Sequence, residues 1–182
     1  MKSKNLKVVF IGNSITEGWV NNMPNFFTSN NYVGRGISGQ TSSQLLLRFR
    51  KDVIELKPLL VVINVGTNDV AENTGEYNEA FTLGNITSMA QIAEANDIKV
   101  ILSSVLPANE FNWRPTIKNV SDKIVSLNQG IKKLAEQYNL PYLDYHTVLK
   151  NKNNGLDFAM ANDGVHPTLA CYEIMADMAL NI

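Results

Sequence analysis

One serine stands where a parallel-sheet protein places its reactive groups. An apolar run ends at Gly12, and the small polar residues Asn13 and Ser14 follow it. A strand that ends in such a turn delivers its next residues to the crevice where open α/β sheets bind ligands. Ser14 is therefore a candidate nucleophile. Because an alcohol is a weak nucleophile, the chain must also supply a base, a group that orients the base, and hydrogen-bond donors for an oxyanion.

Two histidines are the candidates for the base, and each has an aspartate nearby. His166 can take the proton of Ser14 and return it to a leaving alcohol, while Asp163, three residues earlier on the same loop, accepts the other imidazole N–H. The second pair is Asp144 and His146, which share a face of an extended segment without lying near Ser14. We interpret Asp144 as a structural residue at a strand end and His146 as a loop histidine.

Three donors are available for the oxyanion: the backbone N–H of Ser14, the backbone N–H of Gly39, and the side-chain amide of Asn68. Gly39 has no side chain, which lets the backbone approach a substrate closely. Each of these residues also has a structural interpretation, since Ser14 can cap a helix, Gly39 can serve a turn, and Asn68 can cap the segment after it. One nucleophilic site explains all of them together. Asn13 is interpreted as a positional residue.

Strand and helix signals alternate along the chain without a repeat or a linker. Near-continuous apolar runs predict the buried strands of a parallel sheet, and apolar residues at a 3.6-residue period predict the helices between them. The predicted strands are 6–11, 32–37, 59–65, 99–105 and 141–145, and the predicted helices are 18–30, 41–57, 76–96 (with Phe81 facing inward), 116–138 and one that begins at Pro167.

This alternation predicts an α/β fold, a three-layer α/β/α sandwich with a five-stranded parallel sheet and right-handed crossovers. The simplest strand order is the flavodoxin-like order 2-1-3-4-5. In that order the loops after the first three strands are neighbours at the carboxyl edge of the sheet. These loops carry Ser14, Gly39 and Asn68, so we expect one site there. The surface loop 109–115, with Phe111 and Trp113 exposed, follows the fourth strand and can overhang it.

Composition narrows the class of protein. A chain of 182 residues suits one domain, residues 1–182, and its 16 Lys and Arg nearly balance 17 Asp and Glu without a basic run. This excludes a nucleic-acid footprint and a polybasic membrane anchor, and the longest apolar stretch, 58–65, is too short to span a bilayer. The single cysteine, Cys171, excludes an internal disulfide and is expected to be buried. With no paired histidines on a helix face, we expect no metal and no cofactor.

The beginning of the sequence bears on localisation. Residues 1–6 are polar and lack the apolar core of a signal peptide. As written, the sequence predicts a soluble, cytoplasmic protein without stable membrane insertion. A periplasmic or secreted protein whose signal peptide has been removed would look the same. The oligomeric state is left open.

Four separated blocks of the chain resemble the SGNH hydrolases, also called the GDSL-type esterase, lipase and acylhydrolase family. Asn13 and Gln40 differ from the Asp that many members carry at these places. The resemblance implies a single SGNH hydrolase domain in which Ser14, Asp163 and His166 are catalytic and Ser14, Gly39 and Asn68 form the oxyanion hole. The blocks are Gly12-Asn13-Ser14-Ile15-Thr16, Gly36-Ile37-Ser38-Gly39-Gln40-Thr41, Gly66-Thr67-Asn68-Asp69 and Asp163-Gly164-Val165-His166-Pro167.

The resemblance also limits the substrate to a small-molecule ester. A compact chain without a long insertion has little room for a long-chain lipid tunnel, so we expect short acyl groups, foremost acetyl, on a carbohydrate or small alcohol. The alternatives are a lysophospholipase or thioesterase-type acylhydrolase, an inert family member, and a non-catalytic flavodoxin-like ligand-binding module. In that module residues 12–18 would cradle a phosphate at a helix N-terminus, although they lack the P-loop lysine and the Rossmann glycine spacing.

Overall fold

The computed structural model describes residues 8–181 and contains one parallel five-stranded sheet. The strand order is β2-β1-β3-β4-β5, and every neighbouring pair is parallel, so the predicted order is confirmed. The strands are β1 (Val8–Gly12), β2 (Tyr32–Gly36), β3 (Leu60–Ile63), β4 (Lys99–Ser103) and β5 (Tyr142–Leu143).

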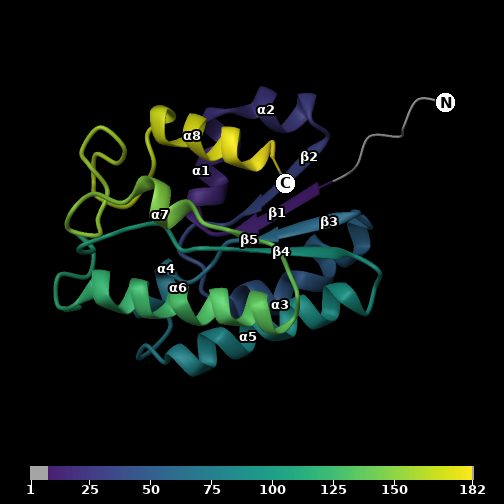
Figure 1. Ribbon diagram of the computed structural model, residues 1–182, viewed down its shortest axis with the longest axis horizontal. Coiled ribbons are helices and arrows are strands. Elements are labelled where there is room, and N and C mark those ends of the chain that lie inside the picture. Colours follow the sequence, from purple (N-terminus) through teal and green to yellow (C-terminus); the bar gives the residue numbers. More distant parts are fainter. Residues whose placement is uncertain (1–7, 182) are drawn as a thin grey trace.

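Helices cover both faces of the sheet, which confirms the three-layer sandwich (Figure 1). One face is covered by α1 (Ser14–Asn22), α2 (Pro24–Ser29), α7 (Tyr145–Leu149) and α8 (Leu169–Ala179). The other is covered by α3 (Ser42–Asp52), the 3₁₀ turn η1 (Ile54–Leu56), α4 (Thr67–Val70), α5 (Glu79–Glu94) and α6 (Val120–Gln137).

The alternation of side chains along each strand divides the interior into two cores. In β1, Val9 and Ile11 pack with the residues of α3, α5 and α6, whereas Val8 and Phe10 pack with those of α1, α2 and α8. Because both faces are covered, all five residues of β1 are buried. This double burial explains why the strand has a continuous apolar run rather than an alternating one.

Several predicted boundaries are wrong for local reasons. The predicted helix 18–30 is two helices, because Pro24 starts α2 after a break at Met23. The last helix begins at Leu169 with Thr168 as its N-cap residue, so Pro167 lies just before it. The last strand has only two residues, since α7 begins at Tyr145. The other elements agree within a few residues, and residue 6, where the first predicted strand begins, lies outside the described part of the chain.

The exposure of two aromatic side chains is the reverse of what the sequence predicts. Phe81 was expected to face the core and is 60% exposed, because the buried face of α5 begins at the next residue, Thr82, and continues through Ile86. Phe111 was expected on the surface and is completely buried in the core that contains Val9 and Ile11 of β1. The loop after β4 is therefore anchored, not loose.

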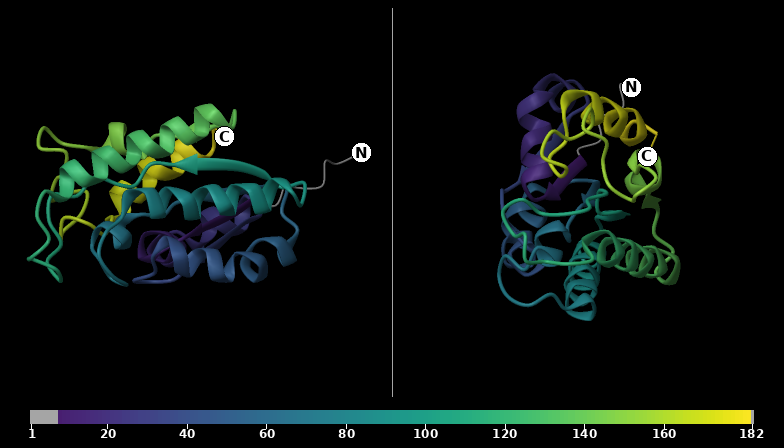
Figure 2. Two further views of the ribbon diagram at one scale, coloured as in Figure 1. Left: turned by 90° about the horizontal axis from the view of Figure 1, so that it is seen from below. Right: turned by 90° about the vertical axis from the view of Figure 1, so that its left-hand side faces the viewer.

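The carboxyl ends of the strands point to the left in Figure 1, and Figure 2 (right) looks onto that edge. The two long loops of the chain, 104–119 and 150–168, both lie there. A hydrogen bond of 3.1 Å from the Asn112 side chain to the Asp163 carbonyl joins them. The edge is thus enclosed by segments from the middle and the end of the chain.

Candidate active site

The turn after β1 places Ser14 as the first residue of α1. Asn13 is the N-cap residue, since its Oδ1 accepts the backbone N–H of Ile15 at 3.0 Å. The capping role that Ser14 could have had is therefore taken by its neighbour, and the Ser14 hydroxyl is left for another partner. Its backbone N–H belongs to the first turn of the helix, whose amides have no acceptor within the helix.

Ser14, His166 and Asp163 form one chain of hydrogen bonds. Ser14 Oγ lies 2.9 Å from His166 Nε2, and His166 Nδ1 lies 2.6 Å from Asp163 Oδ2. The other oxygen of Asp163 accepts the backbone N–H groups of His166 at 2.7 Å and Val165 at 2.9 Å. With Nδ1–H donated to the carboxylate, Nε2 is the nitrogen that accepts the Ser14 hydroxyl. This arrangement can deprotonate Ser14.

The Asp163 carboxyl is held in its ionised form. Burial alone would raise its pKa, but the hydrogen bonds from the His166 side chain and from the backbone amides of His166 and Val165 outweigh burial and lower the pKa below its usual value. An ionised carboxylate at Nδ1 is what an imidazolium needs when His166 takes a proton.

Gly39 lies in the loop after β2, on the same edge of the sheet. Its φ of +78° is a left-handed conformation that side chains rarely adopt. The residue before it, Ser38, is fixed by Glu17 of α1, which accepts both the Ser38 backbone N–H at 3.0 Å and the Ser38 hydroxyl. These bonds tie the Gly39 turn to the helix that carries Ser14.

Asn68 is the second residue of α4 and is 4% exposed. Its Nδ2 donates to the Gln40 carbonyl at 2.9 Å, and its Oδ1 accepts from Asn73 Nδ2 at 3.0 Å. A side-chain amide has two N–H groups, so one remains for a ligand. The structure therefore brings Asn68 to the loop of Gly39, as the strand order predicts.

Two charged residues that support these loops were not singled out as site residues from the sequence. Asp69 accepts the Ser42 backbone N–H at 3.0 Å and also the hydroxyls of Ser42 and Thr82, which joins α4 to α3 and α5. Burial raises the pKa of the Asp69 carboxyl, partly offset by these hydrogen bonds. Asp69 stands beside Asn68 in a quoted block, so its position was a usable signal.

Arg48 of α3 holds the turns of the first two strands together. Its guanidinium donates to the Gly12 carbonyl at 2.8 Å, the Arg35 carbonyl at 3.1 Å and the Gln40 side chain at 2.5 Å, and it pairs with Asp52 at 2.6 Å. No local pattern marks this residue, because a helical arginine is ordinarily a solvated surface residue. Only the packing of α3 against β1 and β2 shows its role.

The second acid–histidine pair is built differently. Asp144 is the N-cap residue of α7 and accepts the Thr147 backbone N–H at 3.0 Å and the Thr147 hydroxyl at 2.8 Å. His146 lies within α7 and is buried, so its interpretation as a loop histidine is wrong. Burial and, to a lesser extent, the charge of Lys150 lower its pKa. The histidine bound to Ser14 is His166.

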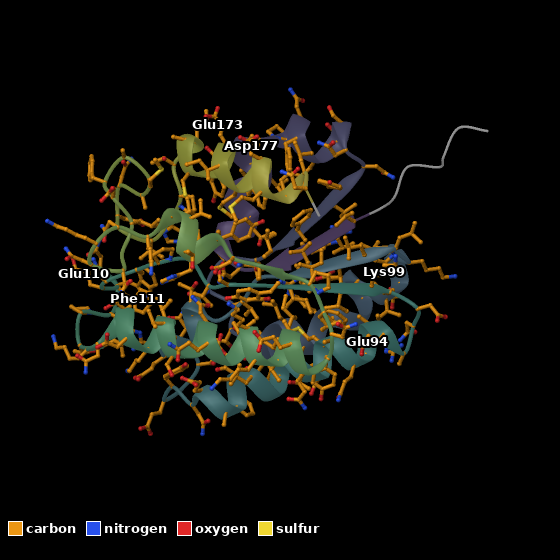
Figure 3. The ribbon with its side chains drawn as sticks, in the orientation of Figure 1. Glu94, Lys99, Glu110, Phe111, Glu173 and Asp177 are labelled. Atoms are coloured by element: carbon orange, nitrogen blue, oxygen red, sulfur yellow. The ribbon has the colours of Figure 1, made fainter. Side chains whose placement is uncertain are left out.

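The loop after β4 reaches His166. Phe111 anchors the loop in the core, and Glu110 and Phe111 lie at the same end of the molecule as the strand carboxyl ends (Figure 3). The Trp113 ring is 41% exposed and lies 5.9 Å from the His166 ring, centroid to centroid, at 38°. Its indole N–H donates to Asn73 Oδ1 at 3.3 Å. The expected overhang of this loop brings one aromatic face to the site.

The site is open to solvent. The side chains of His166 and Asp163 are 42% and 43% exposed. A hollow of about 820 Å³ lies elsewhere, at the amino ends of β3 and β4 around Glu94 and Lys99, at the opposite end of the molecule from Phe111 (Figure 3). Among the described residues that line it there is no serine, cysteine or histidine, so they offer no hydroxyl–imidazole pair like that of Ser14 and His166.

Metal ligation and membrane spanning each depend on features that can be sought within residues 8–181. That part of the chain has no group of three His, Cys, Asp or Glu side chains placed to hold a metal ion. None of the helices in that part of the chain combines the length and the hydropathy that a membrane-spanning helix needs. Cys171 is buried, as predicted, and burial raises the pKa of its thiol to about 11.

Comparison with known proteins gives one consistent family. The GDSL-like lipase/acylhydrolase family matches residues 10–174. Esterase TesA of Pseudomonas aeruginosa is 30% identical over 165 residues, which cover 88% of this chain and 75% of that protein. An acetylxylan esterase of Xylanibacter ruminicola is 26% identical over 147 residues, which cover 70% of this chain. The match spans only 29% of that longer protein's length.

A solved structure shares the fold closely. The crystal structure of a GDSL-like lipase from Bacteroides thetaiotaomicron superposes with a TM-score of 0.96 at 56% identity, covering 98% of this chain and 87% of that one. The family match spans the β1 turn, the two neighbouring loops and the Asp163–His166 loop. The chain therefore belongs to the GDSL-like lipase/acylhydrolase family, the SGNH hydrolases, whose members are carboxylic ester hydrolases.

Proposed function

We propose that the chain is a single SGNH hydrolase domain that cleaves short-chain esters, foremost acetyl esters, of a carbohydrate or small alcohol. The observation that carries the hydrolytic part is the chain of hydrogen bonds from Ser14 through His166 to Asp163, at 2.9 and 2.6 Å. In this proposal Ser14, Asp163 and His166 are the catalytic residues, and Ser14, Gly39 and Asn68 supply the oxyanion donors.

The reaction proceeds through an acyl-enzyme. Ser14 Oγ attacks the acyl carbon while its proton passes to His166 Nε2, and the carbonyl oxygen becomes an oxyanion facing the three donors. The bond to the alcohol oxygen then breaks as His166 returns the proton to that oxygen. Water, deprotonated by His166, attacks the acylated Ser14 in the same way, which releases the acid and restores the hydroxyl.

The open side of the site supports a bulky alcohol. The exposed His166 and Asp163 leave space on the side where the alcohol departs, and the Trp113 ring lies beside it. Aromatic faces pack well against the apolar face of a sugar ring. The name of the Xylanibacter ruminicola relative, acetylxylan esterase, agrees with this class of substrate.

The non-catalytic phosphate-binding alternative is disfavoured by charge. Glu17 lies in the first turn of α1, where a phosphate would sit in the cradle, and its carboxylate is already bound to Ser38. A second anion at this helix end would be repelled. The Ser14 hydroxyl faces a histidine rather than a free backbone cradle.

The test is covalent labelling combined with a substrate panel. A fluorophosphonate probe should modify wild-type protein at Ser14, and Ser14→Ala should abolish both labelling and ester hydrolysis. Ser88→Ala is the matched control, because this hydroxyl bonds only the Gly84 carbonyl on the outside of α5. Absence of labelling in wild type would identify an inert member or a binding module.

The panel then separates the substrates. It contains p-nitrophenyl esters of graded chain length, acetylated xylo-oligosaccharides, a lysophospholipid and an acyl thioester. We expect acetyl and other short esters to give the highest kcat/KM. Activity that rises steadily beyond about eight carbons would contradict the small acyl pocket and favour the lysophospholipase or thioesterase alternative.

A further inference from the structure

An oxyanion donor made from a side-chain amide must be held the right way round. The two ends of an asparagine amide have nearly the same shape, but only the nitrogen end donates. If the Asn68 amide were reversed, its oxygen would face both the Gln40 carbonyl and the developing oxyanion. The site therefore needs something that fixes the direction of the Asn68 amide.

Asn73 fixes that direction. Its Nδ2 donates to Asn68 Oδ1 at 3.0 Å and to the Gly39 carbonyl at 3.1 Å, which uses both of its N–H groups. The Asn68 oxygen is thereby directed to Asn73, and the Asn68 nitrogen donates one N–H to the Gln40 carbonyl, which leaves its second N–H for the proposed oxyanion. One side chain thus touches both loops that carry the non-serine oxyanion donors.

Asn73 is in turn directed by Trp113. An indole N–H can only donate, so the atom of Asn73 that meets Trp113 Nε1 at 3.3 Å must be its oxygen. That leaves the nitrogen of Asn73 for Gly39 and Asn68. The polarity of three side chains, Trp113, Asn73 and Asn68, therefore runs in one direction, from the ring beside His166 to the oxyanion hole.

We propose that Asn73 is a positioning residue of the hydrolytic reaction, which sets the direction of the Asn68 amide and holds the Gly39 turn, and that Trp113 fixes the direction of Asn73. The proposal rests on the proposed function, because it concerns the same oxyanion hole. Asn73 itself touches neither the Ser14 hydroxyl nor His166 through any hydrogen bond described in the structure.

The decisive variant is Asn73→Asp, which keeps the shape of the side chain but removes both donors. A carboxylate at this place would attract the nitrogen end of Asn68 and reverse its amide, so we expect kcat for p-nitrophenyl acetate to fall by about 50-fold with KM within about twofold. Asn73→Ala removes the support without reversing the Asn68 amide, so we expect kcat to fall by about tenfold. These losses are smaller than the roughly 10²- to 10³-fold expected when a donor is deleted.

Two measurements separate positioning from structural damage. The backbone N–H of Asn73, which donates to the Asn68 carbonyl at 3.1 Å, is retained in every variant, so the thermal unfolding midpoint should change little. The rate of fluorophosphonate labelling should fall in parallel with kcat, because the phosphoryl oxygen enters the oxyanion hole. Asn96→Asp is the matched control, since Asn96 lies just past the end of α5 and its side-chain amide donates only to the Ile92 carbonyl of that helix.

Trp113→Phe provides a second route that leaves Asn73 in place. It keeps an aromatic ring beside His166 but removes the donor to Asn73, and we expect a loss of about threefold in kcat. If Asn73→Asp unfolds, unchanged kcat and labelling in Trp113→Phe overturn the proposal.

Other outcomes overturn it directly. Wild-type kcat and labelling in a folded Asn73→Asp variant would show that the amide of Asn68 needs no such support. A raised KM with unchanged kcat would make Asn73 a substrate contact. Failure of the proposed function is distinct, because then wild type and Asn96→Asp would also neither hydrolyse esters nor react with the probe.

Discussion

His166 and His146 each follow an aspartate at short range, and the fold uses the two pairs in opposite ways. In the first pair, one oxygen of Asp163 accepts two backbone amides and the other accepts the ring of His166. In the second pair, both oxygens of Asp144 are bound to Thr147. The ring of His146 is buried instead, and its Nε2 has no partner among the described residues.

The difference lies in the element that carries each pair. Asp163 and His166 stand on a tight turn, so a carboxylate can reach forward three residues to the ring while its second oxygen closes the turn. Asp144 starts a helix, and the carboxylate of an N-cap residue is drawn to the amides of the first helical turn. Spacing alone does not make an acid–base pair; the backbone around the carboxylate decides which donors it meets.

Replacing each histidine by alanine in turn should give the largest difference in activity between the two pairs. His166→Ala should lower kcat by roughly 10⁵-fold, because Ser14 loses its base and the leaving alcohol loses its acid. His146→Ala should keep kcat within about threefold in folded protein. Steady-state kinetics on p-nitrophenyl acetate measure both, and the opposite ranking would show that the pairs were assigned the wrong way round.

The two aspartates give the next largest contrast. Asp163→Asn should lower kcat by about 10³-fold, since an amide no longer stabilises the imidazolium or selects the tautomer in which Nε2 accepts from Ser14. Asp144→Asn should leave kcat nearly unchanged, because asparagine is also a good N-cap residue. Equal losses in the two variants would mean that Asp163 has no special role in the reaction.

Asp144, which should matter little for kcat, should matter for the free energy of unfolding. Asp144→Ala removes the cap of α7 and should cost about 1 kcal/mol of unfolding free energy with little change in kcat. Urea unfolding monitored by circular dichroism measures it, with Asp144→Asn as the conservative control. A stability loss in Asp144→Ala that Asp144→Asn shares fully would indicate that the charge, rather than the cap, is needed.

The smallest effect concerns pH. Burial lowers the pKa of His146 in the folded protein. As the pH falls through about 6.5, the unfolded chain therefore binds a proton at this histidine before the folded protein does. The stability that this histidine contributes is present above that pH and is lost as the pH falls. His146→Gln should therefore flatten the fall in unfolding free energy between pH 7 and pH 5. An unchanged slope would show that His146 titrates normally.

The sequence allowed the sheet and the candidate triad to be predicted for a common reason. Buried parallel strands leave continuous apolar runs, and the turns after them carry polar residues that have no place in a core, so Ser14 and the Asp163–His166 loop stood out. The structure brings these residues into contact, and their catalytic roles stay a prediction.

What could not be predicted depends on contacts between distant segments. The contacts of Asn73 and Arg48 and the burial of Phe111 form only when segments that are distant in the sequence pack together. Such contacts leave no pattern in the local sequence. The helical setting of His146 was missed because α7 is too short to show periodicity. The residues of the candidate triad could therefore be predicted from the sequence, whereas the residues that support them could not.

The contact between Ser14 and His166 joins residues 152 positions apart, and α8, which begins three residues after His166, packs on α1 through Tyr172. Tyr172 donates to the Ile15 carbonyl at 2.9 Å, and its ring stacks on Trp19 at 6.1 Å. Ser14, the proposed nucleophile, thus meets its proposed base, His166, from a distant part of the chain. Ester hydrolysis should therefore report on complete folding, since release of the last helix alone would stop turnover while the central sheet remained intact.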